Sequence, residues 1–73
     1  MKSYEEFRAE CLEVAENRSH YLRKGQAIFN YVDEMYGVAR EAQFKHKIDC
    51  FYLDNKIDEF IKCTYSILKD LSE

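Results

Sequence analysis

The chain contains no proline, and Gly25 and Gly37 are the only glycines among its 73 residues. Proline ends helices, and turns favour proline and glycine, so a chain this poor in both suits long helices with few connections. Hydrophobic residues make up 47% and charged residues 34% of the sequence, which supplies both a core and a solvated surface. We therefore predict a single all-α domain over residues 1–73, near the lower size limit for an unaided core.

Apolar residues that recur at spacings of three and four predict a compact three-to-four-helix domain. Ser3 and Glu6 have the spacing of a capping box at the first helix start. Gly37 stands where the second helix needs a left-handed residue to end. The expected helices cover residues 4–17, 20–36, 38–46 and 55–71.

The boundary between the first two helices has two possible positions. Arg18 falls on the apolar stripe of the first helix, where a buried charge would be costly, so we end that helix at Asn17. Ser19 then becomes the expected N-cap of the second helix. The alternative is a first helix that continues to Leu22, with the Arg18 side chain reaching out to solvent.

Gly25 interrupts the apolar stripe of the second helix. A glycine inside a helix costs about 1 kcal/mol relative to alanine, which indicates that another segment passes close by. We expect that segment to be the backbone of the first or the last helix.

Charge and hydropathy exclude several classes of partner. The net charge is −3, with acids and bases interleaved, so no basic patch for nucleic acid is visible. No apolar run approaches the about 20 residues that span a bilayer, so we expect no membrane partner. Acidic residues follow Met1-Lys2 closely, which argues against a signal peptide. A cytoplasmic location is the expectation.

Cysteine and histidine do not form a recognisable site. The three cysteines, Cys11, Cys50 and Cys63, are odd in number and widely spaced, which argues against disulfides. His46 lies four residues before Cys50, and His20 could join another cysteine, but zinc sites of small domains usually contain close cysteine pairs. We expect no metal, no cofactor and no enzymatic activity, with Cys11 as a small core residue.

The glutamates of the first helix fall mainly on its outward side. Acid–base pairs need contrasting environments, and the sequence shows none, so we interpret this series as a solvated face. Its members are Glu5, Glu6, Glu10, Glu13 and Glu16.

Arg23, Gln26 and Asn30 share one face of the second helix because they are three and four residues apart. This face could recognise a partner or a small ligand. The favoured interpretation is structural: Gln26 and Asn30 bond the backbone of the connector before the last helix, and Arg23 pairs with Asp49 or Asp54.

Tyrosine is the remaining candidate for recognition. Tyr31, Tyr52 and Tyr65 lie off the apolar stripes or in the connector, and exposed aromatics are enriched at protein interfaces. Alternatively, they cap the ends of a small core. The residues that we select as candidate interaction sites are Arg23, Gln26, Asn30, Tyr31 and Tyr52.

Two patterns together resemble a known group of proteins. Residues 23–30 read Arg-x-Gly-Gln-x-x-x-Asn, and residues 49–54 read Asp-x-Phe-Tyr-x-Asp. In this order they resemble very small helical proteins of bacteriophages, prophages and mobile elements that have no assigned activity. The resemblance covers residues 23–60 and leaves the first helix outside. Cys50 departs from the pattern, since proline often precedes Phe-Tyr there. The positions that fit are Arg23, Gly25, Gln26, Phe29, Asn30, Asp49, Phe51, Tyr52 and Asp54.

The resemblance implies a phage-type context and no particular chemistry. Together with size and acidity it predicts a small protein-interaction module that binds a host-encoded protein or a second copy of itself. The alternative is a helix-turn-helix regulator with its turn at Gly37 and residues 38–46 as the reading helix. The basic residues of that helix are balanced by acidic residues there and elsewhere in the chain, so we expect no nucleic-acid partner.

Overall fold

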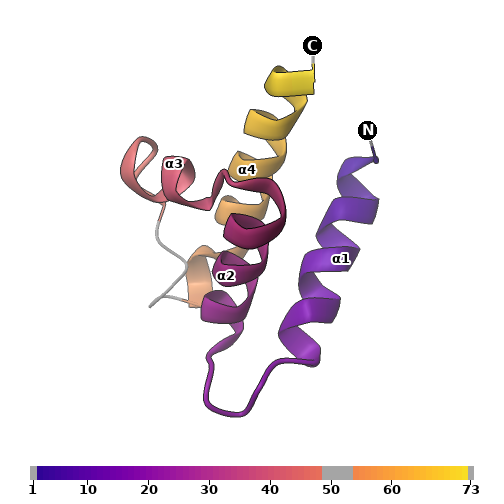
Figure 1. Cartoon of the computed structure of the whole chain (residues 1–73), viewed down its shortest axis with the longest axis vertical. Helices are drawn as coiled ribbons and strands as arrows, with labels where there is room; N and C mark the ends of the chain where they lie inside the picture. Colours follow the sequence, from indigo (N-terminus) through magenta and orange to yellow (C-terminus); the bar gives the residue numbers. More distant parts are fainter. Residues whose placement is uncertain (1, 49–53, 73) are drawn as a thin grey trace.

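The computed structural model describes residues 2–48 and 54–72, and for Asp54 only the backbone. These residues form α1 (Tyr4–Glu16), α2 (Lys24–Tyr36), α3 (Ala39–Phe44), the single 3₁₀ turn η1 (Asp54–Lys56) and α4 (Ile57–Ser72), as Figure 1 shows. The predicted all-α fold is confirmed, and the described ranges contain no strand. Within those ranges, every helix is too short or too polar to cross a bilayer.

The three long helices, α1, α2 and α4, carry the core. Figure 1 shows the start of α1 and the end of α4 at one end of the molecule, with the α1–α2 connection at the other. The short α3 covers one side through Ala39 and Ala42, which are fully buried. The largest fully buried side chains come from α1, α2 and α4: Phe7, Cys11, Ile28, Val32, Phe60, Ile61 and Thr64.

The start of α1 has the predicted capping box. The Glu6 amide donates to Oγ of Ser3 at 3.2 Å, and the Ser3 amide donates to Oε1 of Glu6 at 3.1 Å. These hydrogen bonds satisfy two amides that a helix start leaves free, and they lower the pKa of Glu6.

The predicted start of α2 is wrong by four residues, because α2 begins at Lys24 and not at His20. The cause is Arg18, whose guanidinium donates to the carbonyls of Ala15 at 2.6 Å and Leu22 at 3.0 Å. These bonds hold the connection in a turn that excludes both a helix starting after Ser19 and a first helix reaching Leu22. Ser19 instead accepts the Leu22 amide on its carbonyl at 3.0 Å.

The end of α2 is as predicted. Gly37 has φ 72°, in the left-handed region, and its amide donates to the carbonyls of Val32 at 3.0 Å and Asp33 at 3.1 Å. A glycine takes this conformation without the steric cost of a Cβ, so it ends the helix and turns the chain into α3.

The predicted bounds of the two remaining helices need small corrections. α3 is shorter than residues 38–46: it begins at Ala39, because Val38 is not helical at ψ 0°, and it ends at Phe44, two residues before the predicted end. α4 begins at Ile57 rather than at residue 55, since η1 occupies the preceding turn. Gly25 is buried, and the backbone approach expected there stays a prediction.

Candidate interaction groove

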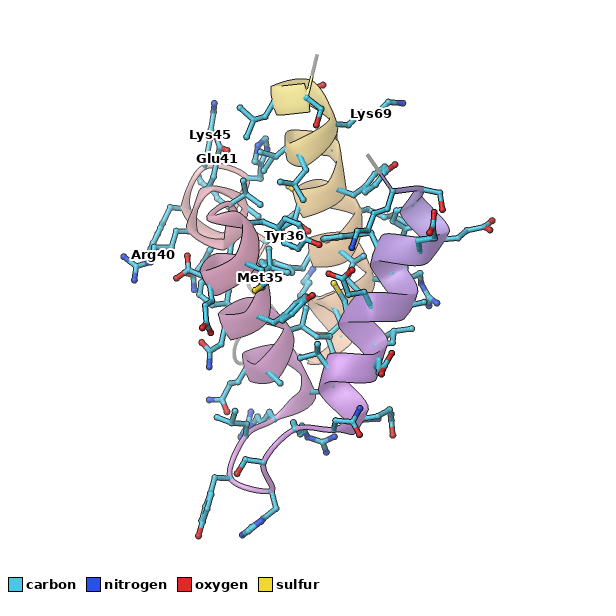
Figure 2. All side chains as sticks on the ribbon, turned by 45° about the vertical axis from the view of Figure 1, so that its right-hand side comes forward. Met35, Tyr36, Arg40, Glu41, Lys45 and Lys69 are labelled. Carbon is cyan, nitrogen blue, oxygen red and sulfur yellow. The ribbon has the colours of Figure 1, made fainter. Side chains whose placement is uncertain are left out.

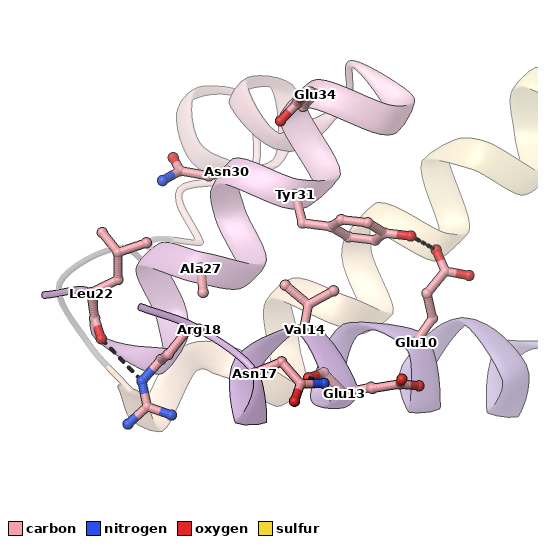
Figure 3. Close-up of a pocket in the computed structure, with 10 residues that line it drawn as sticks. All are labelled: Glu10, Glu13, Val14, Asn17, Arg18, Leu22, Ala27, Asn30, Tyr31 and Glu34. Atoms are coloured by element: carbon pink, nitrogen blue, oxygen red, sulfur yellow. Dashed lines mark hydrogen bonds between the residues drawn. The ribbon is translucent and has the colours of Figure 1, made fainter. Parts of the chain in front are cut away.

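A groove of about 550 Å³ lies on the outer side of α1 and α2. All of its lining residues belong to these two helices or to the connection between them, as the close-up in Figure 3 shows. They are Glu10, Glu13, Val14, Asn17, Arg18, Leu22, Ala27, Asn30, Tyr31 and Glu34.

The lining repeats with the period of the helices. The lining residues of α1 and its C-cap are Glu10 and the residues three, four and seven positions later, and those of α2 follow the same spacing from Ala27. Seven residues at about 1.5 Å each make a groove about 10 Å long, or two helical turns. The two helices run antiparallel, so Glu10 faces the second half of α2 and the groove closes toward the connection.

A hydrogen-bonded cluster defines one end of the groove. The hydroxyls of Tyr31 and Tyr36 both donate to Oε1 of Glu10, the Tyr36 bond at 2.6 Å. The other carboxylate oxygen of Glu10 pairs with Nζ of Lys2, which also lies 5.9 Å from the centre of the Tyr36 ring. We call Lys2, Glu10, Tyr31 and Tyr36 the Glu10 cluster.

The Glu10 cluster shifts the titration of its members. Burial opposes ionisation of Glu10, but the hydrogen bonds from Lys2, Tyr31 and Tyr36 outweigh it, and the pKa of Glu10 falls. Burial and the bond to Glu10 raise the pKa of both tyrosines. The hydrogen bond to Glu10 raises the pKa of Lys2. The cluster is therefore a carboxylate held ionised by neutral phenols and one ammonium.

Glu10 is an exception to the predicted solvated face of glutamates on α1. Its side chain is only 21% exposed, whereas Glu5, Glu6, Glu13 and Glu16 are exposed as expected. Sequence reasoning missed it because the position lies at the flank of the apolar stripe, where only the neighbouring helix decides burial. Two tyrosines five residues apart on α2 were the available signal.

Arg18 defines the other end of the groove. Its two hydrogen bonds to carbonyls tie the last turn of α1 to Leu22, and the guanidinium lies where a helix C-terminus favours a positive charge. Asn17 adds a bond from its side-chain amide to the carbonyl of Glu13 at 3.1 Å. The connection at this end is therefore fixed by the side chains of its own first two residues, Asn17 and Arg18.

The middle of the groove has an apolar floor and acidic rims. Ala27 is 5% exposed and Val14 is half-buried, and Leu22 is half-buried at the Arg18 end. Glu13 on α1 and Glu34 on α2 are exposed. Within residues 2–48 and 54–72, the carboxylates of Glu13 and Glu34 have no ion pair, so the rims carry uncompensated negative charge.

The predicted interaction residues lie in different places. Asn30 and Tyr31 line the groove. Gln26 accepts the Arg23 amide on Oε1 at 3.0 Å and so closes the first turn of α2, with Arg23 at the N-cap position. Tyr52 lies outside the described residues, as do the connector residues expected to bond Asn30.

Tyr65, the third tyrosine outside the stripes, lies in the aromatic end of the core. Its hydroxyl donates to the carbonyl of Lys2 at 2.9 Å, and its ring lies 5.5 Å from that of Tyr4 and 5.7 Å from that of Phe7. These contacts match the alternative that a tyrosine caps the core end.

Among the described residues, the cysteines and metal-ligating groups supply no further site, and Cys50 lies outside them. Cys11 is fully buried, as predicted, and burial raises the pKa of its thiol to about 12. Burial also raises the pKa of Cys63. The part of the chain that the structure describes contains no group of three histidine, cysteine or acidic side chains placed to hold a metal ion.

The short α3 carries the charges that a helix-turn-helix reader would present. Figure 2 shows Arg40 and Glu41 of α3, and Lys45 directly after it, projecting on the side away from α1. Arg40 pairs with Asp33 at 3.8 Å, and Lys45 pairs with Glu41 at 3.6 Å. With six residues, α3 offers less than two turns to a DNA groove.

Comparison of the chain with protein-family models, with curated proteins and with solved structures finds no match in any of the three.

Proposed function

We propose that this protein is a non-enzymatic interaction module and that the groove between α1 and α2 receives a partner protein. The observation that carries the proposal is the groove itself: a floor of apolar side chains between two polar rims, closed by side-chain bonds at both ends. Side chains from another chain could bury apolar surface on this floor and pair with the rims.

The two ends give the groove a fixed shape before any partner binds. The Glu10 cluster joins α1 to α2 at one end, and Arg18 joins α1 to the connection at the other. A surface that is already ordered loses less conformational entropy on association, so more of the contact energy is available for binding. A groove held this way suits recognition better than a surface made only of mobile side chains.

The candidate residues support a protein rather than a small-molecule partner. Tyr31 presents an aromatic ring at the groove, and Asn30 presents an exposed amide on its rim. Aromatic residues are enriched at protein interfaces, where they bury a large area and keep a polar group available. We propose a host-encoded protein or a second copy of this chain as the partner, in keeping with the phage-type resemblance of residues 23–60.

Site-specific photo-crosslinking tests this proposal. A benzophenone amino acid replaces Asn30 in one variant and Lys62, an exposed residue of α4 outside the groove, in the control. Both are irradiated in a lysate of the host cells, and adducts are identified by mass spectrometry. We expect one adduct from position 30 and none from position 62. An adduct from position 62 alone, or none from either, would contradict the proposal.

A further inference from the structure

We infer that the partner of this groove presents a cationic amphipathic helix, with a narrow stripe of small apolar residues between lysine or arginine side chains. The inference rests on the proposed function, and it names the chemistry of the partner at the same site.

The first argument is charge complementarity. Three carboxylates line the groove, those of Glu10, Glu13 and Glu34. Glu10 already pairs with Lys2, but Glu13 and Glu34 have no cationic neighbour within 4.0 Å among the described side chains. The one cation of the lining, Arg18, directs two of its N–H groups at backbone carbonyls at the far end. A cationic partner therefore meets unpaired carboxylates on both rims.

The second argument is shape. The lining positions on α1 and α2 follow the same three–four spacing over two turns, so the rims are rows of side chains with a depression between them. A third helix packs by placing a ridge of side chains into such a depression. The floor at Val14 and Ala27 is apolar and made of small side chains, so a ridge of small apolar residues such as alanine or valine can approach it closely.

Charge and shape together also predict where the basic residues lie on the partner helix. Glu13 belongs to α1 and Glu34 to α2, so the two free carboxylates lie on opposite rims. A partner helix with its apolar ridge on the floor presents residues to each side of that ridge. Lysine or arginine at those flanking positions would reach one rim each.

The chain's own α1 is a poor match for the same groove. The chain carries a net charge of −3, and the exposed face of its own α1 displays four glutamates. Like charges facing each other across an interface are unfavourable, so this groove repels that face.

The contact is small, which predicts the kind of binding to look for. A groove of two helical turns offers less surface than the standard interface of about 1,600 Å², so we expect weak binding. Exposed ion pairs supply much of the attraction, and salt screens them with a Debye length of about 10 Å at 0.1 M. Binding should therefore weaken as salt is added.

Titration with defined peptides tests the inference. The first probe is a capped sixteen-residue helix with an alanine–valine stripe flanked by lysines. In the second peptide glutamate replaces every lysine, and the third has the first peptide's composition with the stripe dispersed. The ¹⁵N-labelled protein is observed by NMR at low and high salt. We expect only the first peptide to bind, with amide shifts at Val14, Ala27 and Asn30 and none at Ser66 on α4.

A charge-reversal pair with a matched control separates local recognition from net charge. Glu13→Lys with Glu34→Lys changes both rims, and Glu5→Lys with Asp70→Lys changes net charge equally at exposed positions outside the groove. We expect the rim variant to lose at least about tenfold in affinity for the first peptide and the control less than about threefold. Circular dichroism checks that both variants are folded.

Each other result would overturn the inference. Equal losses in the two variants would show attraction by net charge alone, and equal binding of the dispersed peptide would show that the stripe is irrelevant. An adduct of twice the chain mass from position 30 would make a second copy the occupant. If position 30 captures a partner protein but no peptide binds, the cationic helix is wrong and the proposed function stands. If position 30 captures no partner and no peptide binds, the proposed function and the cationic helix are both wrong.

Discussion

The Tyr36 hydroxyl donates a 2.6 Å hydrogen bond to Oε1 of Glu10 and so joins the last turn of α2 to the middle of α1. Tyr31 donates to the same oxygen from one turn earlier on α2. The Glu10 carboxylate thus accepts hydrogen bonds from two phenols and an ammonium at the half-buried edge between α1 and α2. It sets how α1 and α2 lie against each other and therefore the shape of the groove beside them.

Removing the Tyr36 hydroxyl should weaken the Glu10 cluster without disturbing the packing. Tyr36→Phe keeps the ring, which lies 5.5 Å from that of Phe7, and removes only the donor. We expect a loss of about 1–2 kcal/mol in the free energy of unfolding, because the bond is to a charged acceptor. Urea denaturation measures it, and Tyr21→Phe, at a side chain 84% exposed, is the control. Equal stability of the two variants would show that the Tyr36 hydroxyl contributes nothing.

The same cluster predicts acid sensitivity. Hydrogen bonds hold the pKa of Glu10 below its ordinary value, so the folded state binds its proton less readily than the unfolded state does. The stabilisation is then present above the unfolded pKa of about 4.3 and is lost as the pH falls through the folded pKa.

Glu10→Gln checks this linkage. The melting temperature of the native protein should fall between about pH 5 and about pH 3, and the variant should show a shallower fall over the same range. Some acid dependence should remain in the variant, because the pKa of Glu6 is also lowered by its capping bonds. Parallel curves for the two proteins would rule out a role for Glu10.

Arg18 should matter more than an exposed arginine. Arg18→Ala removes the bonds to the Ala15 and Leu22 carbonyls and frees the connection between α1 and α2. We expect the free energy of unfolding to fall by about 1–3 kcal/mol. The matched control is Arg40→Ala, whose 3.8 Å pair with Asp33 lies at the surface and should cost less than about 1 kcal/mol. Thermal unfolding compares them, and a similar effect of both would refute the predicted role of Arg18.

Gly37 offers a test of backbone strain alone. An added Cβ would meet nothing within 4 Å, so Gly37→Ala creates no clash with neighbouring atoms. The φ of 72° remains unfavourable for alanine, so we expect the free energy of unfolding, measured by urea denaturation, to fall by about 1 kcal/mol. Asparagine tolerates this conformation better, so Gly37→Asn should lose less. An alanine variant as stable as the native protein would show that the α2 end readjusts.

The sequence alone determined what depends on near neighbours in the chain. The all-α class follows from the lack of proline and the three–four spacing of apolar residues, and the structure confirms it. The cap at Ser3 and the end at Gly37 were predictable because each uses bonds within a few residues. The burial of Cys11 followed from its place at the centre of the α1 stripe.

Only the tertiary structure decided the groove and its two ends. Glu10 lies at the flank of the α1 stripe, and whether it is solvated or bonded depends on where α2 places Tyr31 and Tyr36. Arg18 was equally ambiguous, since its burial depended on a connection that its own hydrogen bonds create. Periodicity shows which side of a helix is apolar, but not which helix covers its edges, because that is set by packing between distant segments.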